Sequence, residues 1–552
     1  MPAIVYDRNA FDTGGSQIFG LQSANRNFLE ALARDDRFPE LSCYTPDEKE
    51  FNSFRSIVDP IAPSAKSIGH IPFGDHAGLS RAGVLHRCDP SIAPYLWQRR
   101  WSDQHLYSLT GIIHSISSRA IMEAIGALVI APLQSWDALI CTSKSGQEAV
   151  RTILNNWTEY LAQRLNAQPK ISIRLPVIPL GIDCDAFQPT NAADMRSRMR
   201  AQLSIAESDI AVLSVGRLAF KRKSHPVPMY LALQRAKQAT GAQVHLIQAG
   251  QFEDDKEEGA FHAAASEFCP DVRTHVVGGR HAFRDQSVWF AGDIFLSLSD
   301  NIQETFGLAP VEAMAVGLPA VVSDWDGYRD TIRDGVDGFR IVTTFPQPSS
   351  GVDLSERYYG FANYRHYYGT VAMSTAVDID ACAEALARLI REPALRNRMG
   401  ASGRLRARTT YDWRVVLRAY RQLWSMLADE RQGNDVVAPT SLGRAPYPLC
   451  DDPFRVFSAH ATRTLAPDTV LSLTNASANE VLDRLRRSWL THFGAEWRLG
   501  REAIVRILGR IERSGSITVA ELADDASVPQ AQLQRTLAYL LKFGIVRIAD
   551  RD

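Results

Sequence analysis

The sequence predicts an α/β protein built on two parallel sheets, each covered by helices on both faces. Short apolar, β-branched runs alternate with longer amphipathic runs along most of the chain, as in doubly wound folds. The runs form two series, separated by a Pro/Thr/Asn-rich stretch near Asp185–Pro189. Two series of this kind favour two Rossmann-like domains.

The candidate strands can be placed from these apolar runs. In the first series they lie near Ala3, Gly83, Gly111 and Ala138, followed by a segment that ends in LPVIPLGID. In the second series they begin at Ala211, Val244, Thr274, Asp293 and Ala320. Helical patterns lie between them, for example LQSANRNFLEALARD and YLALQRAKQATG.

The domain boundaries follow from where these patterns stop. We expect an N-terminal Rossmann-like domain over residues 1–188 and a second Rossmann-like domain over 189–430. The stretch 431–451 is rich in Gly, Pro, Asn and Asp and is typical of a linker. A mostly helical appendage covers 452–552.

Composition excludes several classes of protein. Of 552 residues, 45% are hydrophobic and 22% are charged, which is ordinary for a globular protein. The 61 Lys+Arg and 62 Asp+Glu residues leave a net charge of -1, so no global field attracts nucleic acid or an anionic membrane. No basic segment followed by an apolar core opens the chain, and the apolar stretch from Ala120 is too short to span a membrane. We therefore expect a cytoplasmic protein, with peripheral attachment to the inner face of the membrane as an open alternative.

The most informative segment is NIQETFGLAPVEAMAVGLPAVVSDWDGYRD, which begins at Asn301. Glu304 and Glu312 are separated by seven residues, and Pro310 favours a helix start between them. A helix entered through a glycine turn presents unpaired N–H groups and a positive dipole end, which suit a phosphate. Both acids can then face one ligand, although a lone pair of glutamates at this spacing is usually solvated surface.

This segment resembles the signature region of retaining GT-B glycosyltransferases. From about Ala3 to about Glu430 the chain is similar to glycosyltransferase family 4. The resemblance implies the GT-B fold, in which two Rossmann-like domains face a cleft. Where the family often has Gly-Gly-x-Pro-Glu, this chain has DGYRD from Asp326, so we assign no role there.

The resemblance also assigns roles within the motif. It implies that Glu304 contacts the donor sugar and that Glu312 binds the ribose. The backbone amides between them would bind the diphosphate, and these belong to Phe306, Gly307 and Leu308.

A second motif, SVGRLAFKRKSHP, places cations directly after an apolar strand. Ligands of open α/β sheets bind at the carboxyl ends of strands, and cations aimed at a leaving diphosphate stabilise the charge that develops on it. In the family an Arg and a Lys do this, and Arg217 matches the Arg. Spacing allows Lys221 or Lys223 as the lysine, and we favour Lys223.

Two weaker signals come from the first domain. Gly14 and Gly15 lie between the first strand and the first helix, where the family has a Gly-rich loop close to the donor phosphate and the acceptor. Glycines are also common in such turns for backbone reasons alone. His114 follows a strand in LTGIIHSISS, and a family histidine at this place contacts the donor sugar.

Metal chemistry is not expected. Three D-x-D triplets occur, at residues 183–185, 324–326 and 378–380, and this triplet holds a divalent ion in a different glycosyltransferase fold. The first matches the family's domain-junction pattern, and Arg217 with the lysine can already neutralise a diphosphate. We interpret all three triplets as coincidental and expect a metal-independent enzyme without a cofactor.

Two further segments carry less chemistry. The aromatic-rich stretch Ser355–Val371 could stack an acceptor sugar, but we expect it to pack against the core. In the appendage, ITVAELADDASVPQAQLQRTLAYLLKFGIVRI has the pattern of a winged helix-turn-helix. Its second helix offers only Arg535 and Lys542 as cations, so we expect a packing or protein-binding module rather than a DNA-binding one.

Together these features predict a retaining hexosyltransferase. It would move a sugar from a UDP- or GDP-linked donor to a hydroxyl acceptor, in the assembly of a glycan, polysaccharide or glycolipid. A nucleotide-sugar epimerase on the same fold and a DNA-binding regulator remain as alternatives. A peripheral membrane or protein partner is open, and nucleic acid is not an expected partner.

Overall fold

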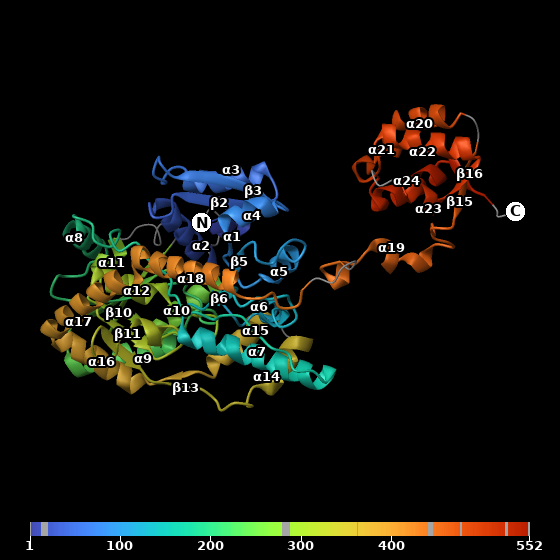
Figure 1. Cartoon of the computed structure of the whole chain (residues 1–552). Coiled ribbons are helices and arrows are strands. Elements are labelled where there is room, and N and C mark those ends of the chain that lie inside the picture. Colours follow the sequence, from blue (N-terminus) through green and yellow to red (C-terminus); the bar gives the residue numbers. More distant parts are fainter. Residues whose placement is uncertain are drawn as a thin grey trace. The chain divides into compact units, whose positions relative to one another are not determined.

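A computed structural model gives the fold of the chain (Figure 1). It describes residues 2–12, 20–278, 287–361, 363–439, 445–474, 477–524 and 528–549. Two compact units divide the chain, Met1–Tyr447 and Pro448–Asp552. In the described parts of the chain, every helix is too short or too polar to cross a bilayer.

The first unit opens with a six-stranded parallel sheet in the order β3-β2-β1-β4-β5-β6. Its central strands are buried along nearly their whole length, as expected of a parallel sheet with helices on both faces. The strands are β1 (Pro2–Val5), β2 (Glu40–Thr45), β3 (Ser67–Pro72), β4 (Val84–Arg87), β5 (Ser108–Ile112) and β6 (Ala138–Ile140). The helices are α1 (Arg8–Phe11), α2 (Gly20–Arg34), α3 (Glu48–Val58), α4 (His76–Ala82), α5 (Ala93–Arg99), α6 (Arg119–Ala127) and α7 (Lys144–Leu165).

A second six-stranded parallel sheet has the order β12-β11-β10-β7-β8-β9. Its strands are β7 (Ile210–Val215), β8 (Val244–Ala249), β9 (Arg273–Val277), β10 (Ile294–Ser297), β11 (Ala320–Ser323) and β12 (Gly338–Ile341). Its helices are α8 (Ala192–Gln202), α9 (Pro226–Thr240), α10 (Asp255–Phe268), α11 (Ser287–Ala291), α12 (Leu308–Val316), α13 (Tyr328–Thr331), α16 (Ile379–Arg391) and α17 (Pro393–Arg406). The two doubly wound sheets confirm the predicted α/β class and its GT-B architecture.

One predicted strand was wrong. The segment ending in LPVIPLGID forms only isolated bridges, from Arg174 to Ala138, from Val177 to Cys141 and from Ile182 to Asp412. Pro176 and Pro179 lack the N–H that a continuous ladder requires. The segment therefore runs beside β6 without extending the sheet as a regular strand.

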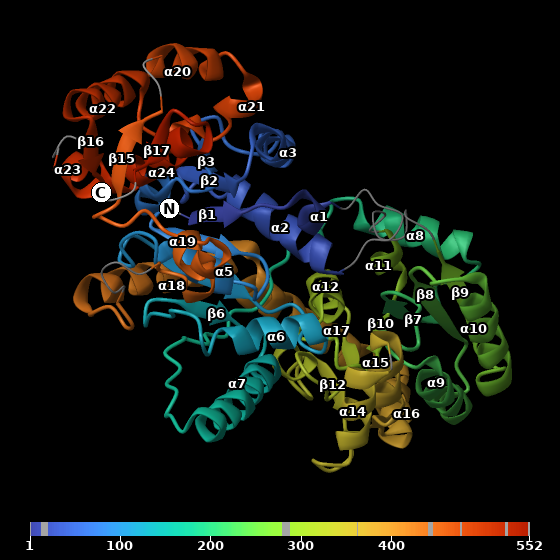
Figure 2. The same cartoon turned by 90° about the vertical axis from the view of Figure 1, so that its right-hand side faces the viewer.

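Helix α18 (Trp413–Gly433) leaves the second sheet and packs on the first (Figures 1 and 2). Its apolar stripe, which includes Trp413, Tyr420 and Trp424, joins the same core cluster as Phe28 of α2 and Leu41 of β2. A π-helical turn, Ala407–Tyr411, connects it to α17. Beyond α18 the chain still contacts the first sheet domain: the Arg100 guanidinium donates to Pro439 O and Pro446 O, at 3.0 and 2.8 Å.

An insertion lies between β12 and α16. Two helices, α14 (Val352–Gly360) and α15 (Tyr364–Met373), are flanked by the short strands β13 (Thr343–Thr344) and β14 (Ala376–Val377). The expectation that its aromatic residues pack in the core is only partly correct. Tyr368 is buried, whereas Tyr359 is 70% exposed and Phe361 is 93% exposed.

The second unit contains a three-stranded antiparallel sheet, β16-β15-β17. Its strands are β15 (Val470–Leu473), β16 (Ser516–Thr518) and β17 (Val546–Ile548), and its helices are α19 (Pro453–Val456), α20 (Ala478–Arg486), α21 (Trp489–His492), α22 (Arg501–Ser514), α23 (Val519–Ala523) and α24 (Gln530–Lys542). The Thr518 hydroxyl and the Glu521 carboxylate form a capping box that starts α23. The helices α23 and α24 and the strand β17 occupy the segments expected for the helix-turn-helix and wing, and the winged-helix assignment itself stays a prediction.

Candidate active site

The topology of the second sheet points to one crevice. Strand β7 pairs with β10 on one side and β8 on the other, so the chain winds outward in both directions from this point. Ligands of open α/β sheets bind at such a switch point, outside the carboxyl ends of the strands. The loops that follow β7 and β10 therefore form the candidate active site, and they carry Arg217, Lys223 and Glu304.

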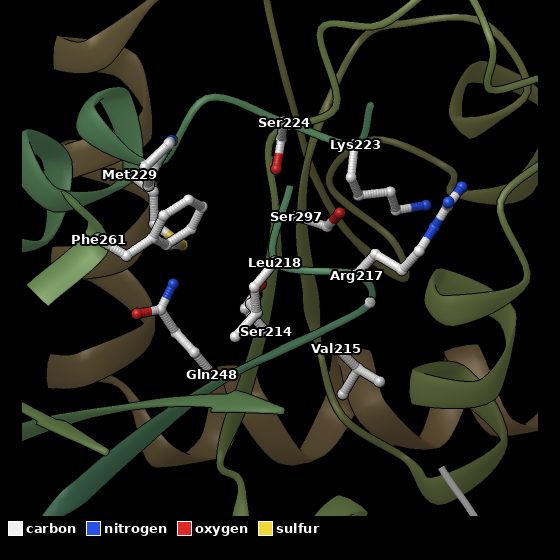
Figure 3. Close-up of a pocket in the computed structure, with 12 residues that line it drawn as sticks. Ser214, Val215, Arg217, Leu218, Lys223, Ser224, Met229, Gln248, Phe261 and Ser297 are labelled. Carbon is white, nitrogen blue, oxygen red and sulfur yellow. The ribbon is translucent and has the colours of Figure 1, made fainter. Parts of the chain in front are cut away.

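The loop after β7 holds the two predicted cations side by side. Figure 3 shows the side chains of Arg217 and Lys223 extending in the same direction from this loop. Both line a small hollow of about 20 Å³, together with Gly216 and Ser297. A Cβ on Gly216 would lie 3.2 Å from Lys223 Cε, so the glycine leaves room for the lysine.

Lys223, rather than Lys221, faces the motif glutamate. The Lys223 ammonium donates to the Glu304 carboxylate, and both side chains are largely buried. Lys221 is exposed and packs against Gly369 and the ring of Phe220. The structure therefore brings Lys223 and Glu304 together and keeps Lys221 away from them.

This contact sets the charge state of both partners. Burial raises the pKa of Glu304, but the Lys223 ammonium and the Phe306 and Gly307 amides outweigh it, so the pKa lies below its ordinary value. Burial lowers the pKa of Lys223, and the Glu304 carboxylate more than restores it. Burial also lowers the pKa of Arg217, as does the nearby Arg222 guanidinium. Glu304 and Lys223 are thus held as an ion pair.

Helix α12 begins beside this pair. Its N-cap, Gly307, has φ 84° and no side chain with which to cap the first amides of the helix. A Cβ on Gly307 would lie 2.0 Å from the ring of Tyr328, and the Tyr328 hydroxyl is 2.9 Å from Ser297 Oγ. Only glycine fits this turn, which places the positive end of α12 next to Lys223 and Glu304.

The remaining residues of the motif differ in how deeply their side chains are buried. Phe306 is buried, with its ring 5.9 Å from that of Tyr411, and Leu308 packs against the core of the second sheet domain, so only their backbones can serve a ligand. Glu312 is half-buried one turn into α12. Burial raises the pKa of Glu312 to about 7, an effect that nearby Lys223 opposes.

His114 reaches the same crevice from the first sheet domain. The Thr305 hydroxyl donates to His114 O at 2.6 Å, and the Thr142 hydroxyl donates to Thr305 O at 3.4 Å. Burial lowers the pKa of His114 to about 4, so its imidazole is neutral. The Nε2 atom of His114 is buried and has no hydrogen-bond partner among the described residues. Gly14 and Gly15 lie outside the described residues.

Sequence reasoning missed several groups at this crevice. The Tyr364 hydroxyl of α15 lies 2.7 Å from Ser117 Oγ and accepts from Gln303 Nε2 at 2.9 Å. It therefore bridges the two sheet domains.

Asp326 was also missed by sequence reasoning. It has φ 43°, and Ser143 Oγ donates to its carboxylate at 3.4 Å. Burial, together with Glu304, raises the pKa of Asp326 well above its ordinary value. The departure from the family pattern at DGYRD was the signal available for Asp326.

The D-x-D carboxylates make protein contacts. Asp185 pairs with Arg408 at 3.0 Å, and Asp324 pairs with Arg340 at 3.2 Å. Asp378 caps α16 by accepting from Ala381 N at 3.0 Å. Within the described residues, no three His, Cys, Asp or Glu side chains gather as a possible metal site.

The part of the chain that carries the candidate active site is similar to a known protein family. Residues 195–351, which carry β7, β10, α12 and the loops between them, match the model of the family described as glycosyl transferases group 1. This segment is therefore similar to that family. The match ends one residue before the inserted helices α14 and α15 begin.

Curated relatives are similar over part of their length. A D-inositol 3-phosphate glycosyltransferase from Geodermatophilus obscurus is 27% identical over 249 residues, which cover 42% of this chain and 51% of that protein. A phosphatidyl-myo-inositol mannosyltransferase from Mycobacterium leprae is 31% identical over 125 residues, covering 23% of this chain and 24% of that protein. The chain thus spans about half or less of the length of these relatives.

Solved structures are more distant in sequence. Alr3699/HepE from Anabaena, in complex with UDP, has a TM-score of 0.49 at 14% identity, covering 77% of this chain and 99% of that chain. A glycosyltransferase from Rickettsia africae has a TM-score of 0.49 at 12% identity, covering 77% and 98%.

Proposed function

We propose that this chain is a retaining glycosyltransferase that moves a sugar from a nucleoside diphosphate donor to a hydroxyl acceptor. One observation carries the proposal. Arg217 and Lys223 lie at the switch point of the second sheet, beside Glu304 and the uncapped start of α12. Two fixed cations and a helix N-terminus that converge on one point suit a diphosphate.

The chemistry follows from these positions. The bond between the anomeric carbon and the phosphate oxygen breaks, and negative charge grows on the departing diphosphate. Arg217 and Lys223 stabilise that charge in a half-buried crevice, where such interactions are strongest. The acceptor oxygen attacks the same face of the sugar, and its proton passes to the departing phosphate oxygen. No protein nucleophile is needed, and the anomeric configuration is retained.

The other residues would position the donor. Glu304 would accept hydrogen bonds from sugar hydroxyls, Glu312 from the ribose, and His114 would contact the sugar from the first sheet domain. Lys223 is already paired with Glu304, so it has to change partner before it can bind a phosphate oxygen of the donor. We infer that Lys223 exchanges Glu304 for a phosphate oxygen as the donor enters.

A thermal-shift screen of UDP- and GDP-linked sugars would identify the donor, and released nucleoside diphosphate would then be measured with a pool of hydroxyl acceptors. A transferase leaves nucleoside diphosphate and glycoside in equal amounts, whereas an epimerase on the same fold returns a nucleotide sugar. NMR of the product would report the anomeric configuration. We expect turnover to survive EDTA and to survive truncation after Tyr447, where the first compact unit ends. Loss of turnover in EDTA, restored by Mg²⁺, would refute metal independence, and an inverted product would refute retention.

A further inference from the structure

A second and larger cavity lies away from the candidate active site. Its volume is about 870 Å³, within the range of small-molecule sites. Pro2 and Val84, the first residues of β1 and β4, contribute to its wall. Because both residues begin their strands, the groove opens at the amino-terminal edge of the first sheet. The donor crevice, by contrast, lies outside the carboxyl ends of the strands.

Five of the fifteen described residues that line this groove are arginines, and none of the fifteen is an aspartate or a glutamate. We call it the arginine groove, and its five arginines are Arg37, Arg81, Arg418, Arg421 and Arg431. They come from the loop after α2, from α4 and from α18. Residues far apart in the sequence thus bring five guanidiniums to one concave surface.

Two of the five arginines bind other groups of the protein through their guanidiniums. Arg37 pairs with Asp35 at 2.6 Å, and its Nη2 donates to Arg414 O at 3.0 Å. The Arg431 guanidinium donates to Gly83 O and, at 3.0 Å, to Ser108 Oγ. These two side chains form fixed positive walls of the groove.

The other three arginines lack acidic partners. Within the described part of the chain, no carboxylate lies within 4.0 Å of the Arg81, Arg418 or Arg421 guanidinium. Arg418 and Arg421 are three residues apart on α18, so they share one face of the helix. One turn further on, this face carries Gln422 and Ser425 rather than acids. Uncompensated guanidiniums on both walls raise the positive potential inside the groove.

The chemistry of the lining selects the class of ligand. Planar guanidinium forks bind the oxygens of phosphate groups bidentately. Phe38 and Trp424, which are mostly buried in the core, form part of the floor of the groove, and the Arg421 guanidinium lies 5.9 Å from the centroid of the Phe38 ring. Several forks around one hollow suit a ligand with one or more phosphate groups on an organic body.

We propose that the arginine groove is a binding site for a phosphate-bearing ligand, separate from the donor crevice. The phosphate can belong to a soluble phosphorylated metabolite or to a phospholipid headgroup, because both present the same oxygens to the guanidiniums.

Calorimetric titration of the full chain with inorganic pyrophosphate tests the soluble source. Flotation with phosphatidylcholine vesicles that contain phosphatidic acid tests the lipid source. The double variant Arg418→Ala/Arg421→Ala should weaken binding at least tenfold for whichever of the two ligands, pyrophosphate or vesicles, the wild type binds. Arg198→Ala/Arg398→Ala removes two exposed helical arginines elsewhere that also have no carboxylate within 4.0 Å in the described structure, and it should bind as the wild type does.

Two further variants make the test decisive. Arg81→Ala changes the opposite wall on α4 and should also weaken binding, which separates loss of the site from damage to α18. Lys223→Ala should leave binding at the groove intact, because Lys223 lies beside the donor crevice and is not among the residues that line the groove. Wild-type binding by both groove variants, binding that depends on Lys223 alone, or no binding in either arm would overturn the proposal.

Discussion

Replacing Lys223 with alanine tests the centre of the candidate active site. The side chains of Lys223 and Glu304 are 22% and 17% exposed. Removing the ammonium therefore leaves a largely buried carboxylate without its ion-pair partner. The Phe306 and Gly307 amides still bond to that carboxylate, so we expect a loss of about 2 kcal/mol rather than the full cost of breaking a buried pair. For a unit of this size, that corresponds to a Tm lower by about 2–5 °C.

The pH dependence of this loss distinguishes the ion pair from general damage. In the wild type the lowered pKa of Glu304 stabilises the fold above the ordinary value of 4.5, and this contribution disappears as the pH falls through the folded-state pKa. In Lys223→Ala, burial then dominates and raises the pKa of Glu304, so protonation relieves the unpaired charge. The difference in Tm should be largest near pH 7.5 and should shrink toward pH 4.5.

The same variant should lose activity in a defined way. Because Lys223 stabilises charge that develops on the departing diphosphate, we expect kcat to fall about 10²-fold, with a much smaller change in donor affinity. Lys221→Ala is the matched control, since Lys221 is exposed in the same loop, and it should behave as the wild type. Scanning calorimetry from pH 4.5 to 7.5 and steady-state kinetics would check both effects. A normal rate in Lys223→Ala, with a slow Lys221→Ala, would refute this assignment.

Three other perturbations have defined outcomes. Burial raises the pKa of Glu312 to about 7. The protonated carboxyl therefore stabilises the fold below pH 4.5, and this contribution is lost as the pH rises through 7. Donor affinity should rise between pH 6 and 8, because the ionised carboxylate is the form that accepts from the ribose. Glu312→Gln should flatten that affinity profile and raise the donor KM about fivefold; an unchanged profile would contradict a ribose contact. Gly307→Ala forces a side chain onto φ 84° and into a ring 2.0 Å away. It should abolish turnover and destabilise the fold by about 2–4 kcal/mol in denaturant unfolding, whereas Gly259→Ala, with nothing within 4 Å, should do neither. Tyr364→Phe removes the hydroxyl that joins the two sheet domains and should lower kcat about threefold to tenfold without changing donor affinity. The exposed control Tyr359→Phe should match the wild type in kinetics, and equal effects of both would argue against the bridge.

The sequence alone determined the two series of buried strands and the position of the main motif. Central parallel strands are covered on both faces, so they are near-continuous apolar runs. The edge strands β3 and β12 gave no such signal, because a glycine and a polar or charged residue interrupt the short apolar run of each. The strand β2 was also missed, since Ser42 interrupts its apolar run.

Tertiary structure decided the finer points of the candidate active site. Lys221 and Lys223 are equally basic in the sequence, and only the path of the loop after β7 turns one of them toward Glu304. Tyr364 joins the site because α15 folds back across the loops of both sheet domains, a contact between residues 247 apart. No local pattern encodes such a pairing, because it depends on the distant elements that pack around it.

The arginine groove depends on tertiary structure in the same way. Its arginines come from three regions of a chain whose net charge is -1, so neither the composition nor any single segment predicts a basic surface. Helix α18 creates the groove by packing its apolar stripe on the first sheet domain, which leaves Arg418 and Arg421 on its exposed side. Burying the apolar stripe fixes the orientation of the helix, and that orientation decides where its charges lie.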